Sequence, residues 1–242
     1  MKTNINPADY RPATPQDLIG KPSELATAVL SAATNAKHQA NSTFKVLFYG
    51  PPGTGKTTIA NMIASCLASE RIDIESINGR NLTIDVVRDW QRHNGYGSLF
   101  GGWKVKLVNE ADIVPMAAQD VMLTYLDDLS PRVAVIATSN EDVATLSPRF
   151  RTRFQCIRVP APEQHEIAAW LRSKFRIAKQ ASEWISATCC GNVRQALLEA
   201  SSFAMTGVLS ENIESRKTVC SSRRDAALRA WDTMRGGKAV AA

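Results

Sequence analysis

A glycine-rich turn limits the possible folds of this chain more than any other segment does. It follows a short apolar run, Phe44 to Tyr49 (FKVLFY), and it precedes a helix-forming stretch that begins at Thr57 (TTIANMIASCLASE). A short apolar run that stops at a glycine is typical of a buried strand, and a strand that feeds a helix through a tight turn is typical of parallel α/β structure. The sequence therefore predicts a strand, a loop and a helix in this region.

The turn also has the residues that a phosphate-binding loop requires. It reads GPPGTGKTT and fits the pattern G-x-x-x-x-G-K-[ST], with the expected strand before it and the expected helix after it. Glycines let the backbone curl so that consecutive N–H groups and the positive end of the following helix point at an anion. We expect ATP to be held by the whole loop, which consists of Gly50, Pro51, Pro52, Gly53, Thr54, Gly55, Lys56, Thr57 and Thr58.

Three side chains of this loop have separate predicted roles. Lys56 supplies a positive charge to the outer phosphates, Thr57 offers its hydroxyl to Mg²⁺, and Thr58 is placed for the inner phosphates. The alternative is a glycine-rich turn that binds nothing, and the strand and helix on either side of the turn disfavour it.

Short apolar runs recur along the first part of the chain. They lie at Ile74 to Ile77, Val105 to Val108 and Val133 to Thr138, with helical patterns between them such as AAQDVMLTYLDDL from Ala117. This alternation predicts a parallel sheet covered by helices on both faces, which is a three-layer α/β sandwich.

The pattern changes after residue 160. The last expected strand, Cys156 to Val159, is followed by Pro160-Ala161-Pro162, and proline neither donates to a strand ladder nor allows helix before it. Only helical patterns follow. We predict an α/β nucleotide-binding domain over residues 1–160, a small all-helical domain over 161–214 and a basic C-terminal extension over 215–242.

Polar residues follow the predicted strand Val105 to Val108. Glu110 is the candidate catalytic carboxylate, because it would orient or deprotonate a water aimed at the terminal phosphate. Asn109 precedes it and, with Thr57, is the candidate metal residue. An amide accepts a hydrogen bond from a metal-bound water but carries no negative charge, so we expect weaker Mg²⁺ binding than a carboxylate would give. Asp112 is expected to cap the next helix.

Taken in order, these residues resemble the AAA+ clamp-loader ATPases, the family of replication factor C small subunits and their phage and bacterial relatives. The opening Y-R-P, followed by D-L-I-G at residues 17–20, is similar to the family signature that encloses the adenine. The resemblance therefore adds four residues to the expected ATP site, namely Tyr10, Arg11, Pro12 and Ile19. It runs from about Tyr10 to about Met205 and implies a P-loop AAA+ sandwich followed by a helical lid.

The resemblance also implies roles for three further residues. Asn140, in the run A-T-S-N, corresponds to a first sensor that detects the terminal phosphate. Arg153 lies where the family carries S-R-C, which implies an arginine finger that reaches into the neighbouring subunit's ATP site. Arg194, in G-N-V-R, corresponds to a second sensor that contacts phosphate in its own subunit. Glu110, Asn140 and Arg153 make up the expected catalytic set.

The sequence departs from the family in two places. Asn109 stands where the family has a metal-binding aspartate, which affects hydrolysis more than ATP binding. The sequence also ends soon after the lid, whereas clamp-loader subunits continue into a helical collar, so we expect the collar to be lacking.

The implied partners are DNA, a sliding clamp or another replication protein, and other subunits in a homo- or hetero-oligomer. Residues from Asn78 to Arg88 resemble the element that leads into a DNA-tracking helix, so Arg80, Arg88 and Arg92 are candidate phosphate contacts. An ordinary exposed helix face explains the same arginines equally well. The formal net charge of +6 fits either a polyanion partner or simple solubility.

The sequence gives no sign of a membrane partner. It has no apolar run long enough to span a bilayer, and its first residues lack the apolar stretch of a secretory signal. We therefore expect a cytoplasmic protein, or a nuclear one in a eukaryote.

Three functions fit these patterns. The first is an ATPase motor subunit that loads a clamp or remodels another protein on DNA. The second is a nucleotide-gated scaffold with weak turnover because of Asn109. The third is a DNA-bound AAA+ filament of the helicase-loader or transposition-regulator type, which needs no collar. The presence of Glu110, Asn140 and Arg153 favours the first.

Overall fold

The computed structural model describes residues 10–140, 146–207 and 209. Within these residues the chain forms two compact units, one made of residues 12–18 and 22–160 and the other of residues 10–11, 19–21 and 161–209. Each unit is described by itself. The basic extension expected over 215–242 lies outside the described residues.

The larger unit contains a parallel sheet of five strands. Their bounds are β1 (Phe44–Tyr49), β2 (Ile74–Asn78), β3 (Lys104–Asn109), β4 (Val133–Ser139) and β5 (Gln155–Arg158). The strand order is β2-β3-β4-β1-β5, and every neighbouring pair is parallel. The carboxyl ends of all five strands therefore meet at one edge, which is where parallel α/β sheets bind their ligands.

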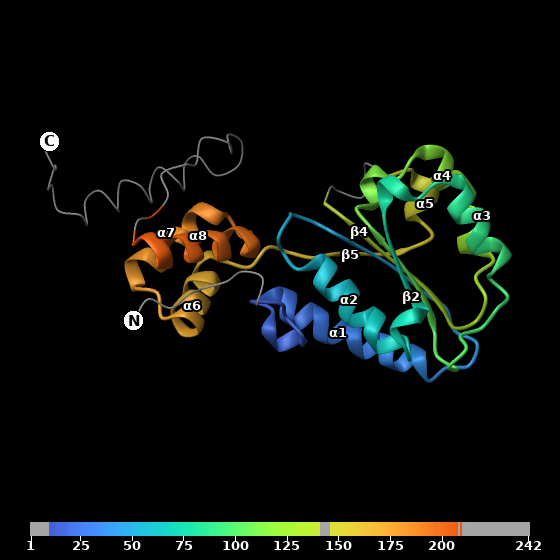
Figure 1. Cartoon of the computed structure of the whole chain (residues 1–242), viewed down its shortest axis with the longest axis horizontal. Coiled ribbons are helices and arrows are strands. Elements are labelled where there is room, and N and C mark those ends of the chain that lie inside the picture. Colours follow the sequence, from blue (N-terminus) through green and yellow to red (C-terminus); the bar gives the residue numbers. More distant parts are fainter. Residues whose placement is uncertain (1–9, 141–145, 208, 210–242) are drawn as a thin grey trace, which may run out of the picture. The chain divides into compact units, whose positions relative to one another are not determined.

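Helices cover both faces of this sheet, as Figure 1 shows. Their bounds are α1 (Lys21–Lys37), α2 (Lys56–Leu67), α3 (Ile84–Arg92), α4 (Met116–Asp127) and α5 (Pro148–Arg151). The predicted three-layer sandwich is confirmed. Helix α1 was not predicted, and α4 begins one residue before the expected helix.

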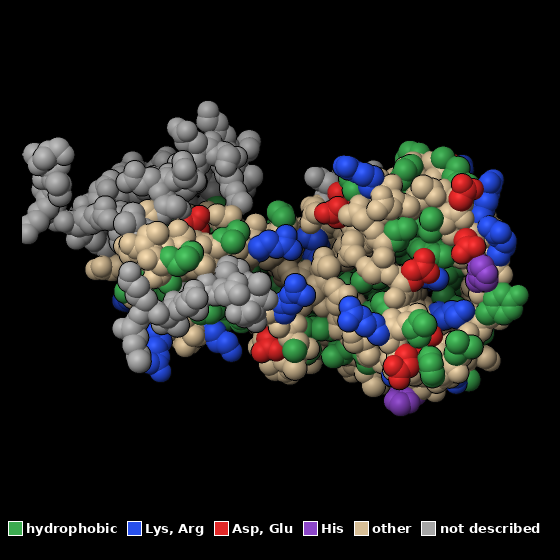
Figure 2. Space-filling model, viewed as in Figure 1, with side chains coloured by type: hydrophobic (Ala, Val, Ile, Leu, Met, Phe, Trp, Pro, Cys, Tyr) green, Lys and Arg blue, Asp and Glu red, His purple; other side chains and the backbone are tan. Residues whose placement is uncertain are grey.

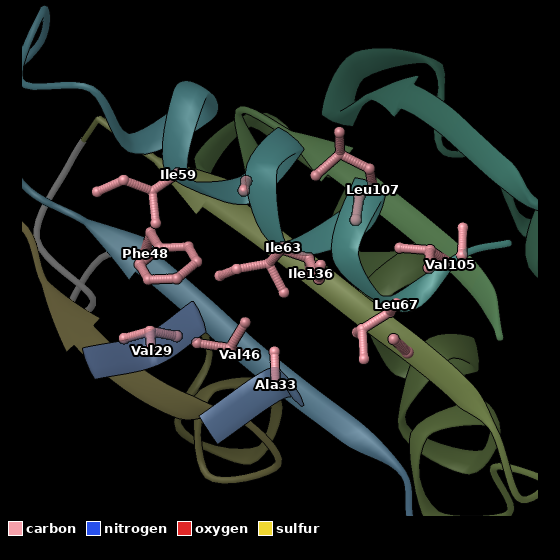
Figure 3. Close-up of a cluster of buried hydrophobic side chains, with 14 of the residues drawn as sticks. Val29, Ala33, Val46, Phe48, Ile59, Ile63, Leu67, Val105, Leu107 and Ile136 are labelled. Carbon is pink, nitrogen blue, oxygen red and sulfur yellow. The ribbon is translucent and has the colours of Figure 1, made fainter. Parts of the chain in front are cut away.

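The two faces of the sheet build separate hydrophobic cores, because successive strand residues point to opposite sides. Val46 and Phe48 of β1 pack with the buried side chains of α1 and α2, such as Ala33 and Ile63 (Figure 3). Leu47, between them in sequence, packs with the buried side chains of α3, α4 and α5 on the other face. Strand β1 is therefore apolar on both faces, as its sequence predicted.

The described secondary structure of the smaller unit consists of helices. It contains α6 (Gln164–Phe175), α7 (Lys179–Cys189) and α8 (Val193–Thr206), which share one hydrophobic core. Asn192 caps α8, because its side chain accepts a hydrogen bond from the backbone N–H of Gln195. Within the described part of the chain, no helix combines the length and the apolar character that crossing a membrane requires.

Candidate active site

The predicted phosphate loop lies between the end of β1 and the first turn of α2. Three of its residues have positive φ, namely Gly50 (137°), Gly53 (74°) and Gly55 (99°). This backbone conformation is energetically unfavourable for residues that have a Cβ atom. A Cβ atom on Gly50 would lie 2.5 Å from the carbonyl oxygen of Val159. The loop conformation therefore depends on its glycines, and Gly50 is further constrained by the chain that follows β5.

Lys56 is held inside this loop. Its ammonium group donates hydrogen bonds to the carbonyl oxygens of Gly50 and Pro51, at 2.9 and 2.7 Å, and the residue is only 5% exposed. The hydroxyl of Thr54 donates to the same Pro51 oxygen at 3.0 Å. The N-cap residue of α2 is Gly55, which has no side chain that could accept hydrogen bonds from the first backbone N–H groups of the helix. The loop thus combines a fixed cation with a helix N-terminus, which suits a phosphate group.

Glu110 directly follows β3 and has a left-handed backbone conformation, with φ 57° and ψ 56°. Its carboxylate accepts a 2.7 Å hydrogen bond from the side-chain amide of Asn78, the last residue of β2. Its backbone N–H donates to the hydroxyl of Thr138 in β4 at 3.3 Å. A non-glycine residue in this conformation is uncommon and indicates a constrained position, here fixed from both neighbouring strands.

Asn78 is a site residue that the sequence reasoning did not assign to the catalytic set. It is paired in register with Asn109, so it lies at the carboxyl end of the strand next to β3. The signal that could have identified it is the polar residue ending β2 at the same edge as Glu110. Its side-chain oxygen also accepts a hydrogen bond from the backbone N–H of Arg80 at 3.0 Å. Asn78 therefore links Glu110 to the segment that leads into α3.

The side-chain amide of Asn109 has a hydrogen-bond partner for its nitrogen but none among the described residues for its oxygen. Its amide nitrogen donates to the hydroxyl of Ser76 at 3.1 Å, while its amide oxygen is buried without a hydrogen-bond partner among the described residues. A buried oxygen without a partner costs free energy, so it favours a donor such as a metal-bound water. The exposed hydroxyl of Thr57, at the start of α2, is a second oxygen of the type that Mg²⁺ prefers. These two residues fit Mg²⁺ chemistry, although neither of them brings a negative charge.

Asn140 follows β4 at the same edge of the sheet. Tyr49 and Ser139 are paired in register, so the residues after them, Gly50 and Asn140, leave adjacent strands together. The backbone N–H of Asn140 donates to the carboxylate of Asp112 at 3.1 Å. The expectation that Asp112 caps the next helix is wrong, because Asp112 lies within a short 3-10 helix (Ala111–Ile113), Pro115 holds the N-cap position of α4, and the Asp112 carboxylate binds the backbone after β4.

Arg153 is bound within its own chain. Its Nε donates to both carboxylate oxygens of Asp127, at 2.9 and 3.0 Å, and its Nη2 donates to one of them at 2.6 Å. Its Nη1 donates to the carbonyl oxygen of Arg149 at 2.8 Å. The guanidinium holds the pKa of the Asp127 carboxyl below its usual value, chiefly through these hydrogen bonds. The sequence reasoning identified Arg153 but not Asp127.

The residues expected around the adenine divide between the two units. Pro12 belongs to the sheet unit, while Tyr10, Arg11 and Ile19 belong to the helical unit. The hydroxyl of Tyr10 accepts a 3.0 Å hydrogen bond from the indole N–H of Trp170 in α6. Ile19 is buried in the core of the helical unit, and Arg11 is exposed. Their role at the adenine stays a prediction.

The remaining sequence candidates are exposed arginines. Arg194 lies on the first turn of α8 in the helical unit, and its sensor role stays a prediction. Arg88 and Arg92 of α3 form ion pairs with Asp85 and Asp89 of the same helix, each at 3.8 Å.

The charges around α3 are mixed. Arg80 is exposed and precedes the helix. Figure 2 shows basic and acidic side chains intermixed over the visible face of the larger unit. Of the three candidate arginines, the two in α3 therefore each have an acidic neighbour on their own helix.

Comparison with known proteins places the sheet unit in a family. Residues 46–160 match the family described as "ATPase family associated with various cellular activities (AAA)". The match runs from β1 through the loop, Glu110, Asn140 and Arg153 to the end of the sheet unit.

Two relatives are similar to this chain over most of its length. Replication-associated recombination protein A of Bacillus subtilis is 25% identical over 208 residues, which are 80% of this chain and 47% of that protein. Replication factor C subunit 3 of Saccharomyces cerevisiae is 27% identical over 199 residues, which are 78% of this chain and 56% of that protein. The chain thus spans about half the length of these two relatives.

The fold also resembles solved structures. A variant of RuvB from Thermotoga maritima superposes with a TM-score of 0.65 at 20% identity, over 94% of this chain and 74% of that one. At this level of identity the likeness shows the fold alone. Residues 46–160 thus match the AAA family, and the chain is similar over most of its length to a replication-associated recombination protein and to a replication factor C subunit.

Proposed function

We propose that this chain binds ATP with Mg²⁺ and hydrolyses it, as a clamp-loader-like subunit in DNA replication or repair. The observation that carries the proposal is the meeting of three strand ends. The phosphate loop follows β1, Glu110 follows β3 and Asn140 follows β4, and these three strands are neighbours in one parallel sheet. A cation, a carboxylate and an amide thereby face one edge, which is the set that phosphoryl transfer to water requires.

Each residue has a part in this reaction. Lys56 and the amides that begin α2 bind the phosphates, and Asn140 binds the terminal one. Glu110 orients the attacking water and accepts its proton. Asn78 holds one oxygen of the Glu110 carboxylate. It therefore sets how freely this group turns toward the water.

Mg²⁺ supplies positive charge that offsets the charge developing between the outer phosphates. Thr57 and Asn109 would hold it, Thr57 through its hydroxyl and Asn109 through its unpartnered amide oxygen. Because both groups are neutral, Mg²⁺ affinity rests mainly on the ATP phosphates.

The order of the motifs also supports proposed roles for five residues at the adenine and phosphates and for one residue in trans. Tyr10, Arg11, Pro12 and Ile19 enclose the adenine, and Arg194 contacts the phosphates. Arg153 acts in trans, as the arginine finger of the adjacent site in a homo- or hetero-oligomer. The support for these roles is the order of the motifs along the chain.

The proposed partners are DNA and a replication protein such as a sliding clamp. The relatives named replication factor C and replication-associated recombination protein support this assignment. Arg80, Arg88 and Arg92 contact DNA phosphates irrespective of sequence, so binding should weaken steeply as salt increases.

A second function, a nucleotide-gated scaffold with little turnover, is favoured by Asn109 alone. The buried amide oxygen binds a water or a metal-bound water but adds no charge to the metal site. ATP would then be a structural ligand that gates assembly.

Turnover measurements separate the two functions. ATP hydrolysis by the wild type is compared with that of Glu110→Gln, with and without primed DNA. Our proposal predicts turnover well above that of Glu110→Gln and stimulation by DNA. A wild type that binds ATP but hydrolyses it no faster than Glu110→Gln supports the scaffold and refutes the motor.

A further inference from the structure

The contact between Asp127 and Arg153 joins two elements on one side of the sheet unit. Asp127 is the last residue of α4, and Arg153 follows the short helix α5. The carboxylate binds the guanidinium from the side, through Nε and Nη2, with distances between 2.6 and 3.0 Å. Two-point binding of this kind fixes the plane of the guanidinium as well as its position.

This contact leaves part of the arginine free to bind another anion. A guanidinium has five N–H donors, and the described contacts of Arg153 to Asp127 and to Arg149 use one hydrogen each on Nε, Nη2 and Nη1. Two donors, one on each terminal nitrogen, remain. The side chain is 27% exposed, so solvent reaches it.

The position of Asp127 argues that it serves Arg153 rather than its own helix. A negative charge at a helix C-terminus is unfavourable because the last carbonyls already carry partial negative charge. Asp127 and Asp128 nonetheless both end α4, and the last turn contains no basic residue. The pKa of Asp127 is lowered first by its hydrogen bond to Arg153 and also by the nearby Lys45. The arginine thus offsets a charge that the helix alone would disfavour.

We propose that Asp127 is the positioning residue of the arginine finger, holding the Arg153 guanidinium in a fixed orientation with its two outer donors directed to a neighbouring subunit's terminal phosphate. The inference rests on the proposed function, in which Arg153 acts in trans. An unrestrained arginine side chain loses rotamer entropy when it is fixed. Asp127 fixes it before the neighbour arrives, so less of this cost falls on the reaction. The Asp127 carboxylate is half exposed and carries a single charge, so a triphosphate with more negative charge competes with it for the free donors of Arg153.

Steady-state kinetics on the full chain, assembled with its partners and DNA, test this role. Asp127→Asn keeps the size of the side chain but removes the charge and one of the two acceptors for the guanidinium. We expect kcat to fall about tenfold, as for other residues that orient a reacting group, while KM for ATP stays within about twofold. Asp128→Asn is the matched control, because it removes the same charge one residue away without contacting Arg153, and it should leave kcat unchanged.

Two further variants separate positioning from a structural effect. In an Arg153→Ala background, Asp127→Asn should cause no further loss, because the group that it positions is absent. Asp127→Glu, which keeps the carboxylate, should recover most of the activity that Asp127→Asn loses. Urea unfolding of each variant shows that the compared proteins are folded.

The possible failures are distinguishable. If Arg153→Ala lowers kcat but Asp127→Asn does not, the positioning role is refuted and the proposed function stands. If Asp127→Asn lowers kcat equally with and without Arg153, the effect is structural and the inference is again refuted. If Arg153→Ala leaves kcat unchanged, the trans role of Arg153 in the proposed function fails, and the positioning role fails with it.

Discussion

Replacing Gly50 by alanine should damage the phosphate loop more than its small size suggests. The residue has φ 137°, and an alanine Cβ would lie 2.5 Å from the carbonyl oxygen of Val159, a distance that real Cβ contacts essentially never show. The backbone conformation costs about 1–3 kcal/mol for a residue with a Cβ atom. The steric overlap with a backbone atom adds about 1–3 kcal/mol. The expected total is about 4 kcal/mol.

Gly101→Ala provides the matched control for this change. Gly101 also has positive φ, 72°, but a Cβ atom there would meet no described atom within 4 Å. It should therefore cost only the backbone strain, about 1 kcal/mol. The difference of about 3 kcal/mol combines the overlap with Val159 and the greater backbone strain at Gly50.

Urea unfolding and isothermal titration calorimetry with ATP measure where this cost appears. If the loop keeps its shape, the free energy of unfolding falls by about 4 kcal/mol. If the loop deforms instead, ATP affinity falls by up to about 1,000-fold, since each 1.4 kcal/mol is a factor of ten. Equal stability and equal ATP affinity for Gly50→Ala and Gly101→Ala would refute the reasoning.

Three other changes test the surrounding site. Asn109→Asp adds a negative charge at the proposed metal position, so in ATP turnover measured against Mg²⁺ concentration the half-maximal rate should occur at lower Mg²⁺ and kcat should rise several-fold. An unchanged dependence on Mg²⁺ would argue against metal binding at this position. Asn78→Asp places a second carboxylate beside Glu110, and repulsion between the two charges raises the pKa of one of the pair. The acidic limb of the kcat–pH profile should therefore move to higher pH by about one unit or more. A limb that does not move would contradict the contact between residues 78 and 110. The pKa of Asp127 is lower in the folded chain than its ordinary value of 3.8, so its ion pair stabilises the fold above that pH and the contribution is lost as pH falls through the lowered value. The stability difference between wild type and Asp127→Asn should shrink accordingly in unfolding experiments at decreasing pH, and a difference that grows with acid would contradict this sign.

The three inner strands of the sheet, β3, β4 and β1, could be predicted from the sequence because each has buried residues on both faces. Runs such as FKVLFY have no polar face to confuse with a loop, and each ends near a glycine, a polar residue or a proline. Helix α1 was missed for the opposite reason. Its buried residues, Pro22, Ala26, Val29 and Ala33, have helical spacing, but most are small, so the apolar stripe is weak.

The phosphate loop could be predicted because its chemistry is local. Glycines, lysine and threonine lie within nine consecutive residues, and the backbone between them determines the geometry. The residues that orient the catalytic groups could not be predicted in this way. Asn78 lies 32 residues from Glu110, and Asp127 lies 26 residues from Arg153, so only the strand register and the helix packing bring them together.

The failed expectation for Asp112 has the same cause. A carboxylate shortly before a helix is typical of a cap, and the sequence gives no sign of a competing donor. The parallel pairing of β3 with β4 brings the backbone N–H of Asn140 within 3.1 Å, and that donor binds Asp112 instead.

Calorimetric titration of ATP into the purified chain with Mg²⁺, for the wild type and for Lys56→Ala, tests the nucleotide site most directly. Lys45→Ala is the matched control, because Lys45 is a lysine of β1 whose ammonium donates to the carbonyl oxygen of Leu126. We predict measurable ATP affinity for the wild type and the control and a loss of at least about tenfold for Lys56→Ala. A wild type without ATP affinity, or a Lys56→Ala variant that binds as tightly as the control, would contradict the account.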